Sequence, residues 1–266
     1  MNKNNAFIET KEYKRFAEFC DACTKYKYIG VCYGPPGVGK TLSARYYANW
    51  NNIEKKLVNQ PFGEVEKNVD TNLLECRTLF HTAPAVKATR LLEKIRVNGI
   101  NLHMVKSEYA NEEEYNLSNW DSNVDLVIVD EIDRLKVQNL EQLRDIYDQN
   151  DIAMVLIGMP GVEKRLARYS QLYSRIGFAH KFNQLNKDEA QHILTYKWRE
   201  LGFPMKLEDF SDYEAVTSII RITGGNFRLM HRLFSQIERI LEINKLNTIT
   251  TEVVETAKDS LVIGGQ

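Results

Sequence analysis

The sequence Gly34-Pro35-Pro36-Gly37-Val38-Gly39-Lys40-Thr41 decides the fold of this chain. It matches the pattern G-x-x-x-x-G-K-[ST], in which glycines let successive backbone N–H groups point inward and form a nest for phosphate oxygens. A helix that begins near Lys40 would add the positive end of its dipole. The stretch therefore predicts a nucleotide-binding P-loop.

The residues on either side of the loop predict the strand and the helix that this motif requires. Residues 28–33 (YIGVCY) indicate a short buried strand, and residues 41–48 (TLSARYYA) indicate the helix that leaves the loop. Lys40 would then reach the β- and γ-phosphates, and the Thr41 hydroxyl would bind Mg²⁺. The residues expected to contact the nucleotide are Gly34, Pro35, Pro36, Gly37, Val38, Gly39, Lys40, Thr41 and Leu42.

A second signal lies at residues 124–131 (VDLVIVDE), an apolar strand that ends in Asp130 and Glu131. Such a strand fits a parallel sheet that is buried on both faces, and open sheets of this kind bind ligands at the carboxyl ends of their strands. Asp130 would hold the Mg²⁺ shell, and Glu131 would polarise the attacking water. The alternative is that the two carboxylates only cap the following turn.

Strands alternate with helices up to about residue 182, which predicts an α/β fold with a doubly wound, mostly parallel sheet. The helix expected at residues 83–97 has Pro84 in its first turn and ends at Asn98-Gly99, and residues 50–61 are expected to be irregular. The other expected strands are residues 78–82, 152–158 and 178–182, and the other expected helices are residues 9–25, 140–149 and 162–169.

After Leu185 the pattern becomes helical, with helices expected at residues 186–201, 213–222, 226–243 and 251–260. We therefore expect two domains. Residues 1–182 would form the α/β nucleotide-binding core together with the N-terminal helix, and residues 183–266 would form a helical lid.

The composition is that of an ordinary globular protein, with a formal net charge of −1. No apolar run approaches the ~20 residues of a membrane span, and the polar N-terminus does not resemble a signal peptide. We expect a cytoplasmic protein without a membrane partner. The pair Cys20 and Cys23 lacks a second pair of ligands, so reduced thiols are favoured over a metal or redox site.

The charges are unevenly distributed along the chain. Residues 107–151 are strongly acidic, whereas the first sixty residues and residues 160–206 are more basic. These segments form solvated faces, or else one surface attracts polyanions while another meets a basic neighbour in an oligomer.

Three arginines outside the loop could stabilise the charge of a phosphoryl-transfer transition state. Arg168 and Arg175 precede the last expected strand, and Arg228 follows Gly-Gly-Asn-Phe at the start of a lid helix. Spacing alone favours a surface salt bridge for each of them.

At these residues the chain resembles AAA+ ATPases, and within them the transposition regulators typified by MuB of phage Mu and by TniB and TnsC. All AAA+ proteins share the P-loop (Walker A) and the acidic strand end (Walker B). The segments FIET (7–10), DEIDRL (130–135) and YSRI (173–176) point to this branch. Residues 252–264 also resemble the end of the lid in ExeA-like ATPases used in secretion.

The resemblance implies ATP as the nucleotide and Mg²⁺ as the cofactor. It makes Lys40 and Thr41 part of Walker A, and Asp130 and Glu131 part of Walker B with Glu131 as the group that activates water. Arg175 would be the arginine finger that reaches the ATP of a neighbouring subunit, and Arg228 would be the sensor-2 arginine. These assignments define an ATPase site shared between subunits.

One position departs from the AAA+ pattern. Relatives usually place a polar sensor-1 residue at the end of the strand expected at residues 152–158, but Met159 and Pro160 follow it here. No residue of this chain is therefore assigned as sensor 1, and either hydrolysis is slow or another residue positions the water.

The resemblance also implies a function in DNA transposition. The ATP-bound protein would form a homo-oligomer, a ring or helical filament, on double-stranded DNA and would recruit or activate a transposase. The basic residues that could contact DNA phosphates, or else simply belong to solvated faces, are Lys87, Arg90, Lys94, Lys106 and Lys164. The alternatives are an ExeA-like or signalling NTPase that acts on protein partners, and a helicase or initiator loader.

Overall fold

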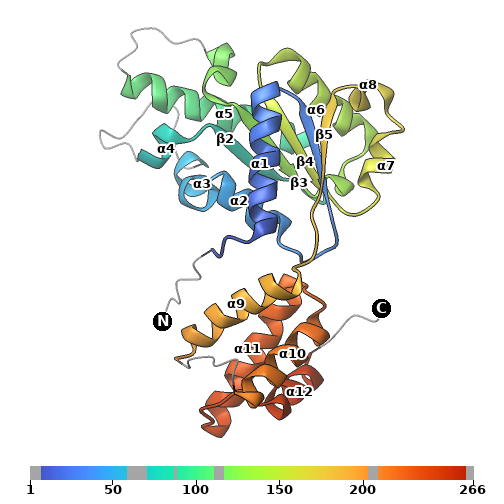
Figure 1. The fold of residues 1–266 in the computed structure, drawn as a ribbon. Coiled ribbons are helices and arrows are strands. Elements are labelled where there is room, and N and C mark those ends of the chain that lie inside the picture. Colours follow the sequence, from blue (N-terminus) through green and yellow to red (C-terminus); the bar gives the residue numbers. More distant parts are fainter. Residues whose placement is uncertain (1–6, 59–70, 87–88, 111–116, 203–208, 262–266) are drawn as a thin grey trace. The chain divides into compact units, whose positions relative to one another are not determined.

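The computed structural model describes residues 7–58, 71–86, 89–110, 117–202 and 209–261. The chain forms two compact units (Figure 1). The sheet unit consists of residues 13–34 and 40–182, and the helical unit consists of residues 1–12, 35–39 and 183–266.

The sheet unit contains a parallel five-stranded sheet with the strand order β2-β3-β4-β1-β5 (Figure 1). All residues of β3 and β4 are buried, which explains why both strands are continuous apolar runs. The parallel sheet confirms the predicted α/β fold. The strands are β1 (Ile29–Tyr33), β2 (Thr78–Thr82), β3 (Leu126–Asp130), β4 (Ala153–Gly158) and β5 (Ile176–Lys181).

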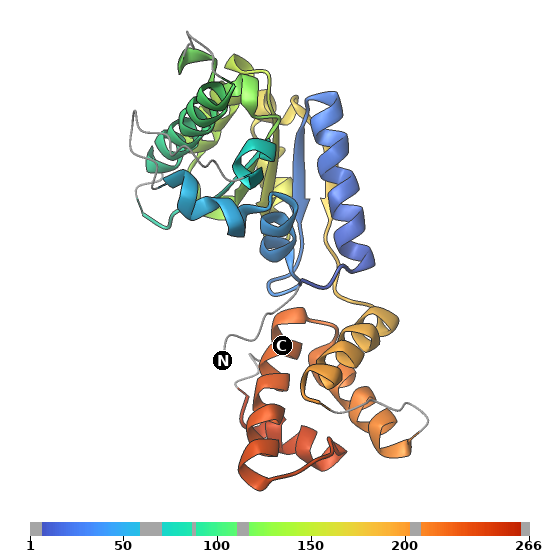
Figure 2. The same ribbon diagram turned by 90° about the vertical axis from the view of Figure 1, so that its left-hand side faces the viewer.

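Helices surround this sheet. α1 (Lys11–Tyr26) lies along β1 and β5 in both views (Figures 1 and 2), where Phe16 and Phe19 contact the rings of His180 and Phe182. The other helices of the unit are α2 (Lys40–Tyr47), α3 (Trp50–Val58), α4 (Thr71–Glu75), α5 (Thr89–Tyr109), α6 (Val137–Gln149), α7 (Val162–Leu166) and α8 (Ser170–Tyr173), with the 3-10 helices η1 (Leu117–Asn123) and η2 (Ile132–Arg134).

The prediction of an irregular segment at residues 50–61 is wrong, because Trp50–Val58 forms α3. Trp50, Ile53 and Leu57 recur at helical spacing, and each is at most 1% exposed. This narrow apolar stripe is enough to fix a helix on the core, although the residues between its members are polar. Residues 59–61 lie outside the described part of the chain.

The predicted bounds of the helix at residues 83–97 are also wrong. α5 begins at Thr89, after Pro84, and continues through Asn98 and Gly99 to Tyr109. A Cβ atom at position 99 would lie 2.1 Å from Cε3 of Trp120, so this glycine permits close packing of the indole and does not end the helix.

The helical unit contains α9 (Lys187–Glu200), α10 (Phe210–Thr223), α11 (Phe227–Asn244) and α12 (Thr251–Asp259). These helices share an apolar core in which the rings of Trp198 and Phe234 are 5.4 Å apart, and Ile8 from the N-terminal segment packs against it. Asn186, Asn226 and Thr250 cap three of the helices with their side chains. The cap residues thus set where these helices begin.

Replacing Gly99 with alanine should lower the free energy of unfolding by about 1–3 kcal/mol, because the new methyl group would overlap Trp120. Urea unfolding would measure the change, with Arg96→Ala on the exposed side of α5 as the control. Helix propensity alone would stabilise the Gly99→Ala variant by about 0.5–1 kcal/mol, so a gain would contradict the packing argument. The loss should shrink in a Trp120→Leu background.

Candidate functional site

The P-loop connects the end of β1 at Tyr33 with the start of α2 at Lys40. Gly37 and Gly39 have φ angles of 81° and 112°, in the left-handed region that favours glycine. The two glycines therefore allow the tight curl on which a phosphate nest depends. Because α2 begins at Lys40, directly after Gly39, the positive end of its dipole lies at the loop.

Lys40 lies inside the loop. Its Nζ donates a hydrogen bond to the carbonyl oxygen of Gly34 at 2.6 Å, and the residue is 8% exposed. Burial lowers the pKa of Lys40, while the carboxylates of Asp130 and Glu131 act in the opposite direction. The geometry thus holds a cation at the centre of the curled loop.

Thr41 and Asp130, the two predicted Mg²⁺ ligands, are in contact although 89 positions separate them in the sequence. The Thr41 hydroxyl donates to Oδ2 of Asp130 at 2.7 Å, and the backbone N–H of Glu131 donates to Oδ1 at 2.8 Å. Asp130 is 3% exposed, and burial raises its pKa. A buried carboxylate beside a hydroxyl is a donor set that suits a hard divalent cation.

Glu131 follows Asp130 in a left-handed backbone conformation, with φ 59° and ψ 38°. This conformation is uncommon for a residue other than glycine, and it persists where surrounding contacts impose it. The side chain is 40% exposed, and its Oε2 lies 3.7 Å from Nη2 of Arg134. Arg134 also donates from Nη1 to the carbonyl oxygen of Ala83 at 2.9 Å, beyond the end of β2.

The end of β4 contacts the turn that follows β3. The backbone N–H of Met159 donates to Oδ2 of Asp133 at 2.8 Å. Met159, which stands where the resemblance would place a polar sensor-1 residue, thus contributes its backbone to this contact. The sequence analysis did not single out Asp133, although the second aspartate of DEIDRL was a signal that could have identified it.

Arg165 on α7 is a further residue that the sequence analysis missed. Its Nη1 donates to the carbonyl oxygens of Asp133 at 3.1 Å and Ile132 at 3.5 Å, and its Nη2 donates to that of Leu135. Backbone carbonyls are present at every residue, so the sequence carries no signal for this contact.

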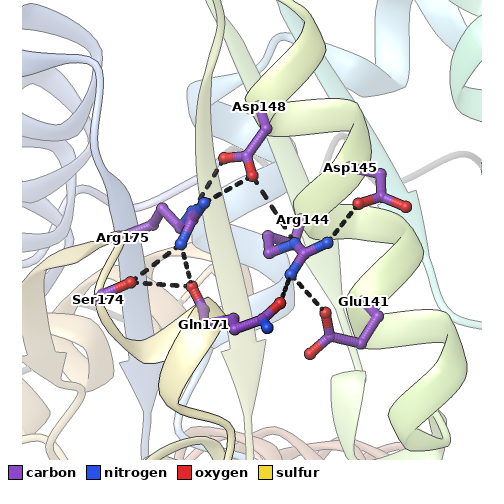
Figure 3. A network of polar contacts seen from close by, with 7 residues as sticks. All are labelled: Glu141, Arg144, Asp145, Asp148, Gln171, Ser174 and Arg175. Atoms are coloured by element: carbon purple, nitrogen blue, oxygen red, sulfur yellow. Dashed lines mark hydrogen bonds and ion pairs between the residues drawn. The ribbon is translucent and has the colours of Figure 1, made fainter.

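Arg175 belongs to a network of polar side chains from α6, α8 and the start of β5 (Figure 3). Its Nε and Nη2 donate to the two carboxylate oxygens of Asp148 at 2.9 and 2.8 Å. Its Nη1 donates to the Gln171 carbonyl oxygen at 2.6 Å and to Ser174 Oγ at 3.0 Å. The hydrogen bonds to Asp148 raise the pKa of Arg175.

The sheet register places Arg175 at the opposite end of β1 from the P-loop. Arg175 precedes Ile176, which pairs with Ile29 at the start of β1, whereas the loop follows Tyr33 at its end. At about 3.3 Å per residue, the five steps from Ile29 to Gly34 correspond to roughly 16 Å. The structure therefore does not bring Arg175 to the P-loop of its own subunit.

Basic residues from outside the acidic stretch 107–151 pair with several of its carboxylates. Arg175 pairs with Asp148, Arg77 pairs with Asp125, and Lys27 pairs with Asp151 at 3.5 Å. Within the stretch, Arg144 lies among three carboxylates of α6 (Figure 3). Much of the acidic character is therefore balanced within the sheet unit.

The start of α11 in the helical unit contacts the backbone of the P-loop residues that belong to the same unit. Asn226 Nδ2 donates to the Pro36 carbonyl oxygen, and the backbone N–H of Arg228 donates to that of Gly37, both at 2.9 Å. The Arg228 side chain is exposed. The predicted sensor-2 arginine thus lies in the helix turn that touches the loop.

The other candidate residues have simpler environments. Lys106 Nζ donates to the carbonyl oxygen of Cys76 at 2.6 Å, so its charge is partly used within the fold. Arg168, Arg90, Lys94 and Lys164 are exposed, and Lys87 lies outside the described residues. All four cysteines are buried and free. No described helix combines the length and apolar character needed to cross a membrane.

Comparison with known proteins gives relatives at two levels of similarity. A "Potential ATP-binding protein" of Staphylococcus aureus is 60% identical over 270 residues, which cover 99% of both chains. The ATP-dependent target DNA activators B of Escherichia phages Mu and D108 are each 26% identical over 237 residues. These matches cover 84% of this chain and 65% of each activator, so the chain spans slightly less than two thirds of their length.

Solved structures share the fold at low sequence identity. The Thermotoga maritima RuvB Holliday junction branch migration motor has a TM-score of 0.58 at 17% identity, covering 96% of this chain and 70% of RuvB. The Aeropyrum pernix ORC1 protein in complex with DNA has a TM-score of 0.58 at 15% identity, covering 98% and 68%. A family model described as an AAA domain matches residues 23–166, which contain the P-loop, Asp130 and Glu131. The chain therefore belongs to the AAA family and is an AAA+ ATPase similar to the phage Mu target DNA activator B.

Proposed function

We propose that this chain is an ATP-hydrolysing switch that assembles on double-stranded DNA and there recruits or activates a transposase. The contact between Thr41 and buried Asp130, beside the P-loop, carries the hydrolysis part of the proposal. The similarity to the phage Mu target DNA activator B over 84% of this chain supports the DNA part.

The loop residues 34–42 would hold ATP, with Lys40 as the cation that faces its β- and γ-phosphates. Thr41 and Asp130 would hold Mg²⁺, which neutralises phosphate charge and orients the phosphates when it is bound. Glu131 would accept the proton of the attacking water, since its carboxylate is partly exposed just beyond the end of β3. These roles use side chains that the fold already gathers at one end of the sheet.

A role for Arg175 in catalysis requires a second subunit. The roughly 16 Å that separate it from its own P-loop along β1 argue against a role within one subunit. As an arginine finger it would act on the ATP of a neighbour, which makes the active form an oligomer. Arg228 would act in its own subunit, because the turn that carries it contacts Gly37.

Contacts with DNA would be made to phosphates by exposed basic residues such as Arg90, Lys94 and Lys164. Such binding weakens with salt and has little sequence preference. An ExeA-like or signalling NTPase, or a helicase loader, would use the same site differently. Pull-down of a transposase, as against a ring helicase or a secretion component, would separate these functions.

Filaments or rings on DNA should form with ATP and not with ADP, as measured by electron microscopy. Lys40→Ala should abolish nucleotide binding, because the loop then lacks its cation. Glu131→Gln should bind ATP and remain assembled, because hydrolysis would fall by a factor of about 10²–10⁴ when the general base is lost. A protein that remains a monomer in the presence of both ATP and DNA would overturn the proposal.

Replacing Asp130 with asparagine should stabilise the nucleotide-free protein, and increasingly so at higher pH. The raised pKa of Asp130 means that its protonated form favours folding; this contribution is complete below the unfolded pKa near 3.9 and is lost as pH rises through the folded pKa. Thermal unfolding between pH 4 and 7.5 would measure the difference from wild type.

The same variant tests the Mg²⁺ assignment. Mg²⁺ with an ATP analogue should raise the unfolding temperature of the wild type much more than that of Asp130→Asn. An equal rise in both proteins would contradict Asp130 as a metal ligand, and a pH-independent difference would contradict the buried-carboxylate argument.

Arg175→Ala should lose most hydrolysis while ATP affinity stays within about twofold, because the finger acts on the transition state. Mixing this variant with Lys40→Ala subunits should restore part of the activity, since an Arg175→Ala site next to a Lys40→Ala subunit would receive a finger from it. Arg96→Ala, at an exposed position of α5, is the control. No recovery in the mixture would refute action between subunits.

A further inference from the structure

The turn that carries Glu131 is held from outside by α7. Arg165 donates to three backbone carbonyl oxygens of this turn, those of Ile132, Asp133 and Leu135. Within the turn, the backbone hydrogen bonds are Arg134 N to Glu131 O at 3.1 Å and Leu135 N to Ile132 O at 3.0 Å. The last carbonyls of a one-turn 3-10 helix need donors from outside the helix, and the Arg165 guanidinium supplies donors to those of Asp133 and Leu135. Its contact with the Ile132 carbonyl, which already accepts from Leu135 N, is a longer one at 3.5 Å.

A second contact fixes the same turn to the end of β4. Asp133 accepts a hydrogen bond from the backbone N–H of Met159, and its Oδ2 would lie 2.8 Å from a Cβ atom at Gly158. Arg165 is only six positions after Met159. The short segment that follows β4 therefore holds the Glu131 turn at two places. Met159 bonds the Asp133 carboxylate, and Arg165 bonds backbone carbonyls of the turn.

These contacts of Arg165 and Met159 affect the position of Glu131. The left-handed backbone of Glu131 is unfavourable by itself and depends on contacts that impose it. The residue that follows β4 is Met159, which offers no polar side chain for water or phosphate. The geometry points to Arg165 as a positioning residue that sets the Glu131 carboxylate for water activation in the ATPase reaction. This inference rests on the proposed role of Glu131 as the general base.

The chemistry of the contact explains the residue type. A guanidinium is planar and presents several N–H donors in a fixed fork, so it can bond separate carbonyls at once. A lysine ammonium keeps the charge but lacks the fork. Arg165→Lys should therefore lose part of the positioning, and Arg165→Met, with similar length and no donors, should lose it all.

The test measures single-turnover ATP hydrolysis, ATP affinity and thermal unfolding for Arg165→Lys and Arg165→Met in the full chain. Displacing a catalytic group by about 1 Å can cost roughly 100-fold in rate, so Arg165→Met should be about 10- to 100-fold slower while ATP affinity changes less than twofold. Arg165→Lys should lie between Arg165→Met and wild type. Arg96→Lys, on the exposed side of α5, should hydrolyse ATP as wild type does.

A double-variant cycle separates positioning from general support of the fold. In a Glu131→Gln background, Arg165→Met should cause almost no further loss of rate, because both changes act on the same step. An equal loss in both backgrounds, a matching loss of ATP affinity, or an unchanged rate would overturn the inference. If Arg165→Met does not fold, Arg165→Lys in the same cycle decides the question.

The Glu131→Gln and Arg165→Met variants together distinguish failure of the proposed function from failure of the inference about Arg165. Rapid hydrolysis by Glu131→Gln alone would refute Glu131 as the base, and the inference about Arg165 would fall with it. Slow hydrolysis by Glu131→Gln together with normal hydrolysis by Arg165→Met would leave the proposed function intact and refute only the positioning role.

Discussion

The hydrogen bond between Thr41 and Asp130 is the constraint on which the site depends. It joins the last residue of the P-loop motif to the end of β3, although β4 lies between β1 and β3 in the sheet. A parallel sheet brings the carboxyl ends of all three strands to one edge, so the contact follows from the strand order. The end of β4 occupies the middle of this edge, which explains why Met159 and Asp133 meet there.

The same edge concentrates features that do not favour folding. Asp130 and Lys40 are buried, and burial raises the pKa of Asp130 and lowers the pKa of Lys40, which disfavours the charged form of each. Glu131 has a backbone conformation that is unfavourable for its residue type. The apolar strands β3 and β4, buried throughout, supply the stability that tolerates these features. Destabilising groups held by a stable frame are typical of functional sites.

The sequence predicted the elements that have a repeating apolar pattern or that require glycine in the backbone. Apolar runs identified β1, β3 and β4, and the glycines identified the loop. It did not predict α3, because polar residues interrupt the apolar stripe of Trp50, Ile53 and Leu57. It also did not predict that α5 continues through Gly99, because this glycine is required by its packing against Trp120, which is distant in the sequence. The role of Arg165 could not be predicted from sequence, since its partners are backbone carbonyl oxygens that any residue provides.

The pairing of Arg175 with Asp148 is compatible with a role for this arginine between subunits. Both side chains are about one third exposed, at 34% and 33%, so water and salt already weaken the pair. Asp148 would also retain a partner if Arg175 turned away, because Nε of Arg144 lies 3.7 Å from its Oδ2 (Figure 3). Since a carboxylate that keeps a cation loses little when another leaves, the network would release Arg175 at low cost, and a neighbour's phosphates would compete for it with greater charge.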